Sequence, residues 1–280
     1  MKKISRRSFL AAAAVSAAAL ALTACGGSAS TASSAAASSV AASSEAASTS
    51  AAAGELTTVE AGKLTMATNA TFPPYEMTTD AGTIEGIDVD TAKAIAEKLG
   101  LELQIDDMDF DAALLSVQQG KADIVMAGVT VTDERKAVMD FSDSYATGIQ
   151  SIIVPNDSDI ASPDDLAGKK IGTQRGTTGY IYCSDDFGDE NVVAYDDGLT
   201  AVQALNNGQV DAVVIDNAPA QEFVAANPGL KVLDTSYAEE DYAIGMAKGS
   251  ALEDAVNKAL EELKADGTLQ AIVDKYIKAE

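Results

Sequence analysis

MAGVTVTDER, residues Met126 to Arg135, is the stretch on which the predicted fold depends. The apolar run Ile124–Ala127 indicates the end of a buried strand, and Gly128, Thr130 and Arg135 follow it. In open α/β sheets, ligands bind beyond the carboxyl ends of the strands. A guanidinium, a hydroxyl and a glycine backbone close together in sequence therefore indicate a receptor for a small carboxylate that also carries an amine. A surface arginine after a strand is the alternative.

The pattern around this stretch occurs twice. Residues 113–127, ALLSVQQGKADIVMA, align without gaps on residues 201–215, AVQALNNGQVDAVVI. Each copy reads as a helix, a glycine that ends it, and an aspartate before a buried strand, as expected for a helix that leads into a parallel strand. The repeat predicts two lobes of similar architecture.

The alignment places Asp216 at the same strand end as Gly128. If the two lobes face each other, one cleft receives Arg135 and Thr130 from one side and Asp216 from the other. A cation and an anion set apart in this way suit an α-amino acid zwitterion, whose carboxylate pairs with a guanidinium and whose ammonium pairs with a carboxylate, a hydroxyl and a carbonyl. The alternative role of Asp216 is to cap a helix over residues 217–226.

Strands and helices alternate along the rest of the chain, which favours largely parallel, doubly wound sheets. A glycine-bearing loop at residues 175–179 opens a helix, and its backbone N–H groups favour an anion, with Thr177 as the expected contact. The other expected elements are strands 63–68, 101–105, 150–154, 170–173 and 242–247, helices 91–99 and 111–119, a loop at 69–76, and two C-terminal helices separated at residues 266–267.

The composition excludes several classes of function. The chain has 43 acidic and 19 basic residues and a formal net charge of −24, so its surface repels nucleic acid. It contains no histidine, which excludes Ser-His-Asp and Cys-His catalysis and removes the commonest zinc ligand. Cys183 is therefore expected to be a buried, inert thiol. We predict no catalytic residue, metal site or cofactor.

The N-terminal part of the chain indicates export. Residues 1–24 have a basic start and an apolar run too short for a comfortable membrane span, which is typical of a signal peptide. The segment ends in LTAC, which resembles a lipobox, so Cys25 is the expected lipidation site; a free cysteine is the alternative. The paired arginines of SRRSFL leave general and twin-arginine export open. Residues 25–58 are rich in Ala and Ser and predict a flexible tether.

Several segments resemble the extracellular solute-binding proteins of polar amino acid ABC importers, the glutamine-, histidine- and arginine-binding group. The resemblance covers about residues 60–280. It rests on TFPPYE (71–76), GIDVD (86–90), MDFDAALL (108–115), QQGKADIVMAGVTVTDERK (118–136), DFSDSY (140–145), AVVIDNAP (212–219) and ALEELKADGTLQAIVDKY (259–276).

The resemblance implies a two-lobed, periplasmic-binding-protein-like α/β fold with a cleft between the lobes. The lobes would be joined by two hinge crossings, near residues 145–149 and 241–244. Residues 59–146 and 243–280 would then form lobe 1, and residues 147–242 would form lobe 2. A monomer is expected, held at the membrane by its lipid anchor.

The resemblance also implies roles for site residues. Arg135 would bind the ligand's α-carboxylate, helped by Thr130 and Thr177. Asp216, Thr130 and the carbonyl of Gly128 would receive the α-ammonium. The side chain of the ligand would lie between two aromatic rings, those of Phe72 and Phe110.

The ligand's side chain is the least determined part of the prediction. Asn69 stands at a ligand-binding position where relatives that bind glutamine or cationic ligands commonly have Asp. By the same resemblance, the glutamine-binding members have a Lys at the position of Gln174 and a His at the position of Ile215. A cationic side chain would have no obvious counter-ion except Glu76 or an acid that the sequence does not place, so the sequence favours a neutral polar or sulfur-containing amino acid, with cystine, glutamine and smaller polar ligands open.

The predicted function is to bind a small amino acid outside the membrane and to deliver it to an ABC permease by closing around it. Two alternatives from other classes stay open. One is a sensor that presents its closed form to a receptor. The other is a dehydratase-like enzyme on the same scaffold, for which Glu76 is the one further cleft carboxylate.

Overall fold

The computed structural model describes residues 56–277. The expected signal peptide, Cys25 and most of the Ala/Ser-rich tether lie outside these residues and stay predictions. Among the helices within the described range, none is long and apolar enough to cross a membrane.

The first sheet has the strand order β5-β1-β6-β14-β7, and β14 runs antiparallel to its neighbours. Its strands are β1 (Lys63–Thr68), β5 (Glu102–Asp107), β6 (Ile124–Val125), β7 (Met139–Phe141) and β14 (Gly245–Ala247). Its helices are α1 (Ile87–Leu99), α2 (Phe110–Gln118), α3 (Asp133–Val138), α7 (Glu253–Ala265) and α8 (Thr268–Tyr276). We call this sheet with its helices the first lobe.

Alternation along β1 explains how both faces of the first sheet are covered. Met66 packs in a core with residues of α1, α7 and α8, whereas its neighbour Ala67 packs in a separate core with residues of α2. Successive side chains of a strand point to opposite faces, so a strand that is apolar at both positions is buried on both sides.

The second sheet has the order β10-β9-β11-β8-β12, with β13 also paired to β8, and β8 runs antiparallel to its neighbours. Its strands are β8 (Ala146–Pro155), β9 (Ile171–Gln174), β10 (Val192–Tyr195), β11 (Ala212–Asp216), β12 (Leu230–Val232) and β13 (Ala238–Tyr242). Its helices are α4 (Thr178–Phe187), α5 (Gly198–Asn206), α6 (Asn217–Ala226) and the short 3-10 turns Pro163–Leu166 and Asp189–Asn191. We call this sheet with its helices the second lobe.

The helices of the second lobe also lie on both faces of their sheet. Val213 of β11 packs with residues of α5 and α6, and Val214 packs on the other side with residues of α4. Cys183 of α4 belongs to this second core, where burial raises the pKa of its thiol to about 12. The expectation of a buried, unreactive thiol agrees with this environment.

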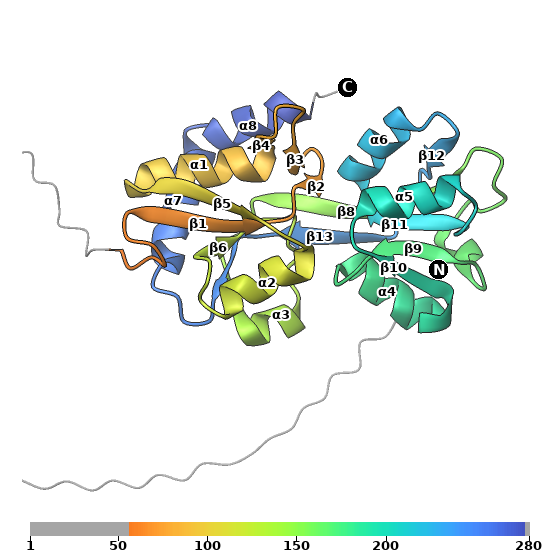
Figure 1. Cartoon of the computed structure of the whole chain (residues 1–280), viewed down its shortest axis with the longest axis horizontal. Coiled ribbons are helices and arrows are strands. Elements are labelled where there is room, and N and C mark those ends of the chain that lie inside the picture. The colour runs from red at the N-terminus through yellow and green to blue at the C-terminus, as the bar shows by residue number, and fades with distance from the viewer. Residues whose placement is uncertain (1–55, 278–280) are drawn as a thin grey trace, which may run out of the picture. The chain divides into compact units, whose positions relative to one another are not determined.

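Two paired strands, β8 and β13, run between the lobes (Figure 1). They pair antiparallel from Ala146 opposite Tyr242 to Gln150 opposite Ala238, and Thr130 of the first lobe forms a bridge to Tyr242. The hinge crossings expected near residues 145–149 and 241–244 lie along or beside these strands and stay a prediction. The expected lobe limits at residues 146 and 242 stay a prediction.

The structure corrects several expected elements. The single strand expected over residues 242–247 is wrong, because the chain leaves the second sheet after β13 and enters the first at β14, with a break between them. The loop expected at 69–76 instead contributes to a three-stranded sheet of β2 (Thr71–Phe72), β3 (Glu76–Thr78) and β4 (Ile84–Glu85). Arg135, expected after a turn, lies in the short helix α3.

Candidate functional site

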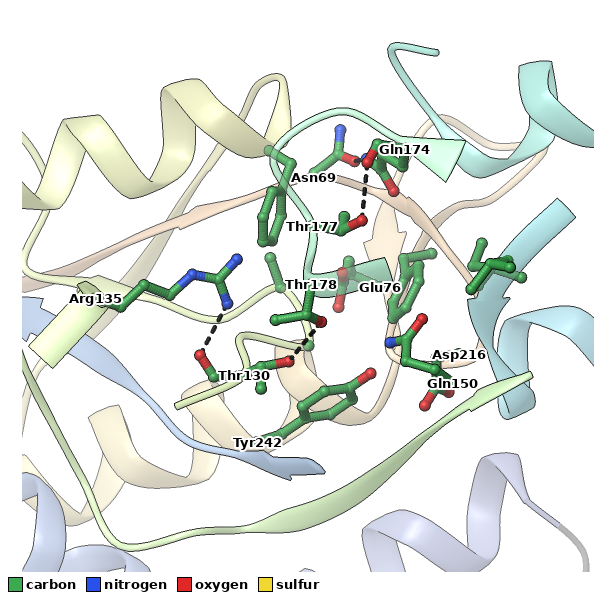
Figure 2. A pocket seen from close by; sticks show the side chains of 16 residues that line it. Asn69, Glu76, Thr130, Arg135, Gln150, Gln174, Thr177, Thr178, Asp216 and Tyr242 are labelled. Atoms are coloured by element: carbon green, nitrogen blue, oxygen red, sulfur yellow. Dashed lines mark hydrogen bonds between the residues drawn. The ribbon is translucent and has the colours of Figure 1, made fainter. Parts of the chain in front are cut away.

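A cavity lies between the two lobes (Figure 2). All eight residues predicted to contact the ligand line it, and they come from both lobes. The predicted residues are Asn69, Phe72, Phe110, Gly128, Thr130, Arg135, Thr177 and Asp216, and the remaining lining residues are Glu76, Ala127, Gln150, Gln174, Thr178, Val214, Ile215 and Tyr242.

Arg135 is held with its guanidinium at one side of the cavity. Thr132 caps α3 by accepting a hydrogen bond from the Arg135 backbone N–H over 3.1 Å. The guanidinium donates to the carbonyl of Thr130 over 2.8 Å and, from the other lobe, to that of Gly176 over 3.1 Å. Its carbon lies 5.4 Å from the ring centre of Phe110. Since a guanidinium has five N–H donors, three are left for a ligand carboxylate.

Burial lowers the pKa of Arg135, and the nearby Glu240 carboxylate opposes that shift. The group stays protonated, because its ordinary pKa is far above neutrality. The cavity therefore has a fixed positive charge on this side.

Thr130 is oriented by Glu240, a buried carboxylate that the sequence analysis did not identify. Thr130 Oγ1 donates to Glu240 Oε2 over 3.0 Å, and Gln150 Nε2 donates to the same oxygen over 3.0 Å. Because its one hydrogen is used, the Thr130 hydroxyl accepts from Thr178 Oγ1 over 3.4 Å and has one further lone pair for the cavity. It can accept from an ammonium group, as predicted, but this geometry leaves it no hydrogen for a carboxylate.

Asp216 lies on the side of the cavity away from Arg135 (Figure 2). Its Oδ1 accepts from the backbone N–H of Ala218 over 3.0 Å, so it does cap α6, and its Oδ2 accepts from that of Ile149 over 2.8 Å. Burial raises the pKa of Asp216 to about 6, although these backbone donors lower it. The capping alternative is thus realised, and a role in binding an ammonium group stays a prediction.

Gly128 is fixed from behind by Asp88. Its backbone N–H donates to Asp88 Oδ2 over 3.0 Å, and the hydroxyl of Tyr145 donates to the same oxygen over 2.8 Å. Gly128 has φ 55°, and a Cβ there would press against the ring of Phe72 at 2.8 Å. The glycine therefore permits the close approach of this backbone to the aromatic wall of the cavity.

Thr177 lines the cavity and caps α4. Its hydroxyl donates to the carbonyl of Gln174 over 2.8 Å and accepts from the N–H of Tyr180 over 3.3 Å. Its contact with a ligand carboxylate stays a prediction. The segment can still offer the N–H groups of the first turn of α4, which have no partners within the helix.

The predicted contacts for a ligand side chain lie around the rest of the cavity. Phe72 stacks on Tyr75 with ring centres 5.7 Å apart, and Phe110 lies under Arg135. Asn69 Oδ1 accepts from Gln174 Nε2 over 2.8 Å, which joins the lobes across the cavity. Whether the two Phe rings enclose a ligand stays a prediction.

The sequence over residues 64–279 matches the bacterial extracellular solute-binding proteins, family 3. The chain belongs to this family. Its members are extracellular solute-binding proteins, and the two-lobed α/β fold class expected from the sequence is confirmed, since solved amino-acid-binding proteins share it.

Among relatives, the chain is 34% identical over 225 residues to the L-cystine-binding protein TcyJ of Escherichia coli (strain K12), covering 79% of this chain and 85% of the relative. It is 34% identical over 228 residues to the arginine-binding extracellular protein ArtP of Bacillus subtilis (strain 168), covering 78% and 87%.

Solved structures of amino-acid-binding proteins are also similar to this chain. The arginine-, lysine-, histidine-binding protein ArtJ from Geobacillus stearothermophilus has a TM-score of 0.75 at 35% identity, over 78% of this chain and 96% of that one. An ancestral arginine-binding protein bound to glutamine has a TM-score of 0.74 at 42% identity, over 78% and 99%. The protein named for arginine, lysine and histidine and the protein bound to glutamine thus have nearly the same TM-score with this chain.

Proposed function

We propose that the protein binds an α-amino acid outside the cytoplasm and presents it to an ABC permease. The observation that carries the proposal is a half-buried guanidinium and a buried carboxylate, Arg135 and Asp216, on opposite sides of one cavity. Together with Thr130, which has a lone pair left to accept a hydrogen bond, they complement a zwitterion. Relatives named for cystine, arginine and glutamine support the same class of ligand.

Binding would be coupled to closure of the two lobes. Arg135 reaches Gly176 and Asn69 reaches Gln174 across the cavity, so the closed form already has hydrogen bonds between the lobes. A ligand that contacts both lobes adds to these bonds only in the closed form, and it shifts the population toward that form. The paired strands β8 and β13 provide the hinge.

Anchoring is the second part of the proposal. A lipid on Cys25 and the Ala/Ser-rich tether would keep the monomeric protein near its permease, which raises its effective concentration there. We expect ligand binding without turnover, as in a carrier rather than an enzyme.

Calorimetric titration of the chain from residue 26 onward with the common amino acids and cystine tests the proposal. We expect one or a few of them to bind with micromolar or tighter affinity, and recovered ligand to be chemically unchanged. Arg135→Ala should abolish binding while the thermal unfolding temperature stays close to that of the wild type.

The matched control is Arg175→Ala. Arg175 is an exposed arginine that pairs with Asp196 on the surface, so its loss removes the same charge without touching the cavity. If no amino acid binds the wild type, the proposal is refuted. If Arg135→Ala binds like the control, the assignment of the carboxylate site is refuted.

A further inference from the structure

Glu76 is a lining residue of the cavity whose carboxylate has no hydrogen-bond donor. It lies at the start of β3, its side chain is fully buried, and neither carboxylate oxygen has a partner among the residues described. A buried carboxylate without a donor or a cation is costly, because it has lost its water and gained nothing in return. Such a group at a binding cavity points to a partner that the ligand supplies.

A neighbouring acid does not satisfy Glu76. Asp88 is also fully buried, and its Oδ1 likewise has no donor among the described residues. One proton shared between the two carboxyl groups would satisfy one oxygen of each. The second oxygen of Glu76 would still lack a donor, and the pair would still carry one negative charge.

Acidic groups outnumber cationic groups around the cavity, which also favours a cation supplied by the ligand. Arg135 is the one cationic residue of the lining, which has two acidic residues, Glu76 and Asp216; two more buried acids, Asp88 and Glu240, lie behind Gly128 and Thr130. The charged groups that act most strongly on Glu76 are Asp88 and Asp107, and after burial they are what raises its pKa. None of the described ion pairs includes Glu76.

We propose that Glu76 is the counter-ion for a cationic group at the end of the ligand's side chain. The ligand class is then an α-amino acid whose side chain ends in a guanidinium or an ammonium group. A ligand whose only charges are those of the zwitterion would pair its carboxylate with Arg135 and its ammonium group with Asp216. The Glu76–Asp88 pair would then have no partner. This inference rests on the proposed function and names the ligand class for the same cavity.

The assignment differs from the sequence-based expectation, which favoured an uncharged side chain because Asn69 is not an acid. In the structure, Asn69 is used in another way: its carbonyl oxygen accepts from Gln174, and its amide donates to the carbonyl of Met108 over 3.0 Å. The negative charge that recognises a cation is supplied instead by Glu76, seven positions further along the chain.

A pair of ligands of nearly equal shape tests the proposal: L-arginine and L-citrulline, in which an uncharged urea replaces the guanidinium. L-lysine and L-glutamine form a second pair. In calorimetric titrations of the wild type, we expect arginine to bind about 10- to 100-fold more tightly than citrulline, as for a charge-assisted hydrogen bond to a buried carboxylate.

In Glu76→Gln, that ratio should fall to about 1 or 2, mainly through weaker arginine binding, since the carboxamide has the same shape but no charge. The matched control is Glu97→Gln, which removes an exposed carboxylate from α1 of the same lobe and should leave the ratio unchanged. Thermal unfolding of each variant shows that it is folded.

The outcomes separate the two proposals. If citrulline or glutamine binds the wild type as tightly as arginine or lysine, the assignment of Glu76 is overturned while the proposed function stands. The assignment also falls if Glu76→Gln keeps the wild-type ratio. If no α-amino acid binds, the proposed function fails, and the assignment of Glu76 fails with it.

Discussion

Replacing Glu240 by glutamine should weaken ligand binding although this side chain is not part of the cavity lining. Its Oε2 accepts hydrogen bonds from Thr130 and Gln150, while its Oε1 is buried with no partner in the described part of the chain. Glutamine keeps the shape but replaces one oxygen by an NH₂ group; where this NH₂ takes the place of Oε2, it donates to Thr130 Oγ1 and Gln150 loses its acceptor. The Thr130 hydroxyl is then free to turn its hydrogen toward the cavity, where an ammonium group needs a lone pair.

The magnitude follows from the bonds that change. An ammonium group that loses one charge-assisted acceptor loses about 1.5 to 3 kcal/mol, which is about 10- to 150-fold in affinity. The stability of the ligand-free protein should change much less. The bond between residues 130 and 240 is kept with its direction reversed, Gln150 loses one bond at a cost of about 1 kcal/mol, and removal of a buried charge whose Oε1 has no donor offsets part of that cost.

The assay is calorimetric titration with the amino acid that binds the wild type most tightly, together with thermal unfolding. Glu239→Gln is the matched control, because Glu239 is the exposed neighbour on the same strand and loses the same charge. Wild-type affinity in Glu240→Gln would refute the reasoning. In a Thr130→Val background, Glu240→Gln should change affinity by about twofold or less; a full loss there would show that Glu240 does not act through Thr130.

Two further predictions concern stability. Gly148→Ala should destabilise the protein by about 1 to 3 kcal/mol in chemical denaturation, since a Cβ there would overlap the buried ring of Tyr242; unchanged stability would contradict this packing. Burial raises the pKa of both Asp88 and Asp216 from 3.8 to about 6, so their stabilising contribution is complete below about pH 4 and is lost as the pH rises through about 6. Asp88→Asn should therefore show a smaller rise in unfolding temperature than the wild type between about pH 7 and about pH 5; an equal rise would refute this contribution of Asp88.

Local sequence pattern predicted the repeating units correctly. Within the repeat, helix 111–119 and the strands before Gly128 and Asp216 depend on periodicity and a glycine end, and outside it helix 217–226 depends on its capping residue; all of these act over a few residues. The structure agrees within one or two residues for these helices, and helix α6 matches the expected limits. The break between β13 and β14 was missed, because it depends on which sheet each half joins and not on the residues themselves.

For the site, the sequence by itself supplied the residues whose chemistry stands out beside a strand end: a guanidinium, a hydroxyl, a glycine and an aspartate. The structure brings these to one cavity, and their contacts with a ligand stay predictions. Only the tertiary structure decided what lies behind them. Glu240 is one among 43 acidic residues, and nothing local distinguishes it from exposed ones; Glu76 was expected in the cleft, but its complete burial without a donor was not. Their importance comes from burial and from the donors they have or lack, and both are set by segments distant in sequence that pack around them.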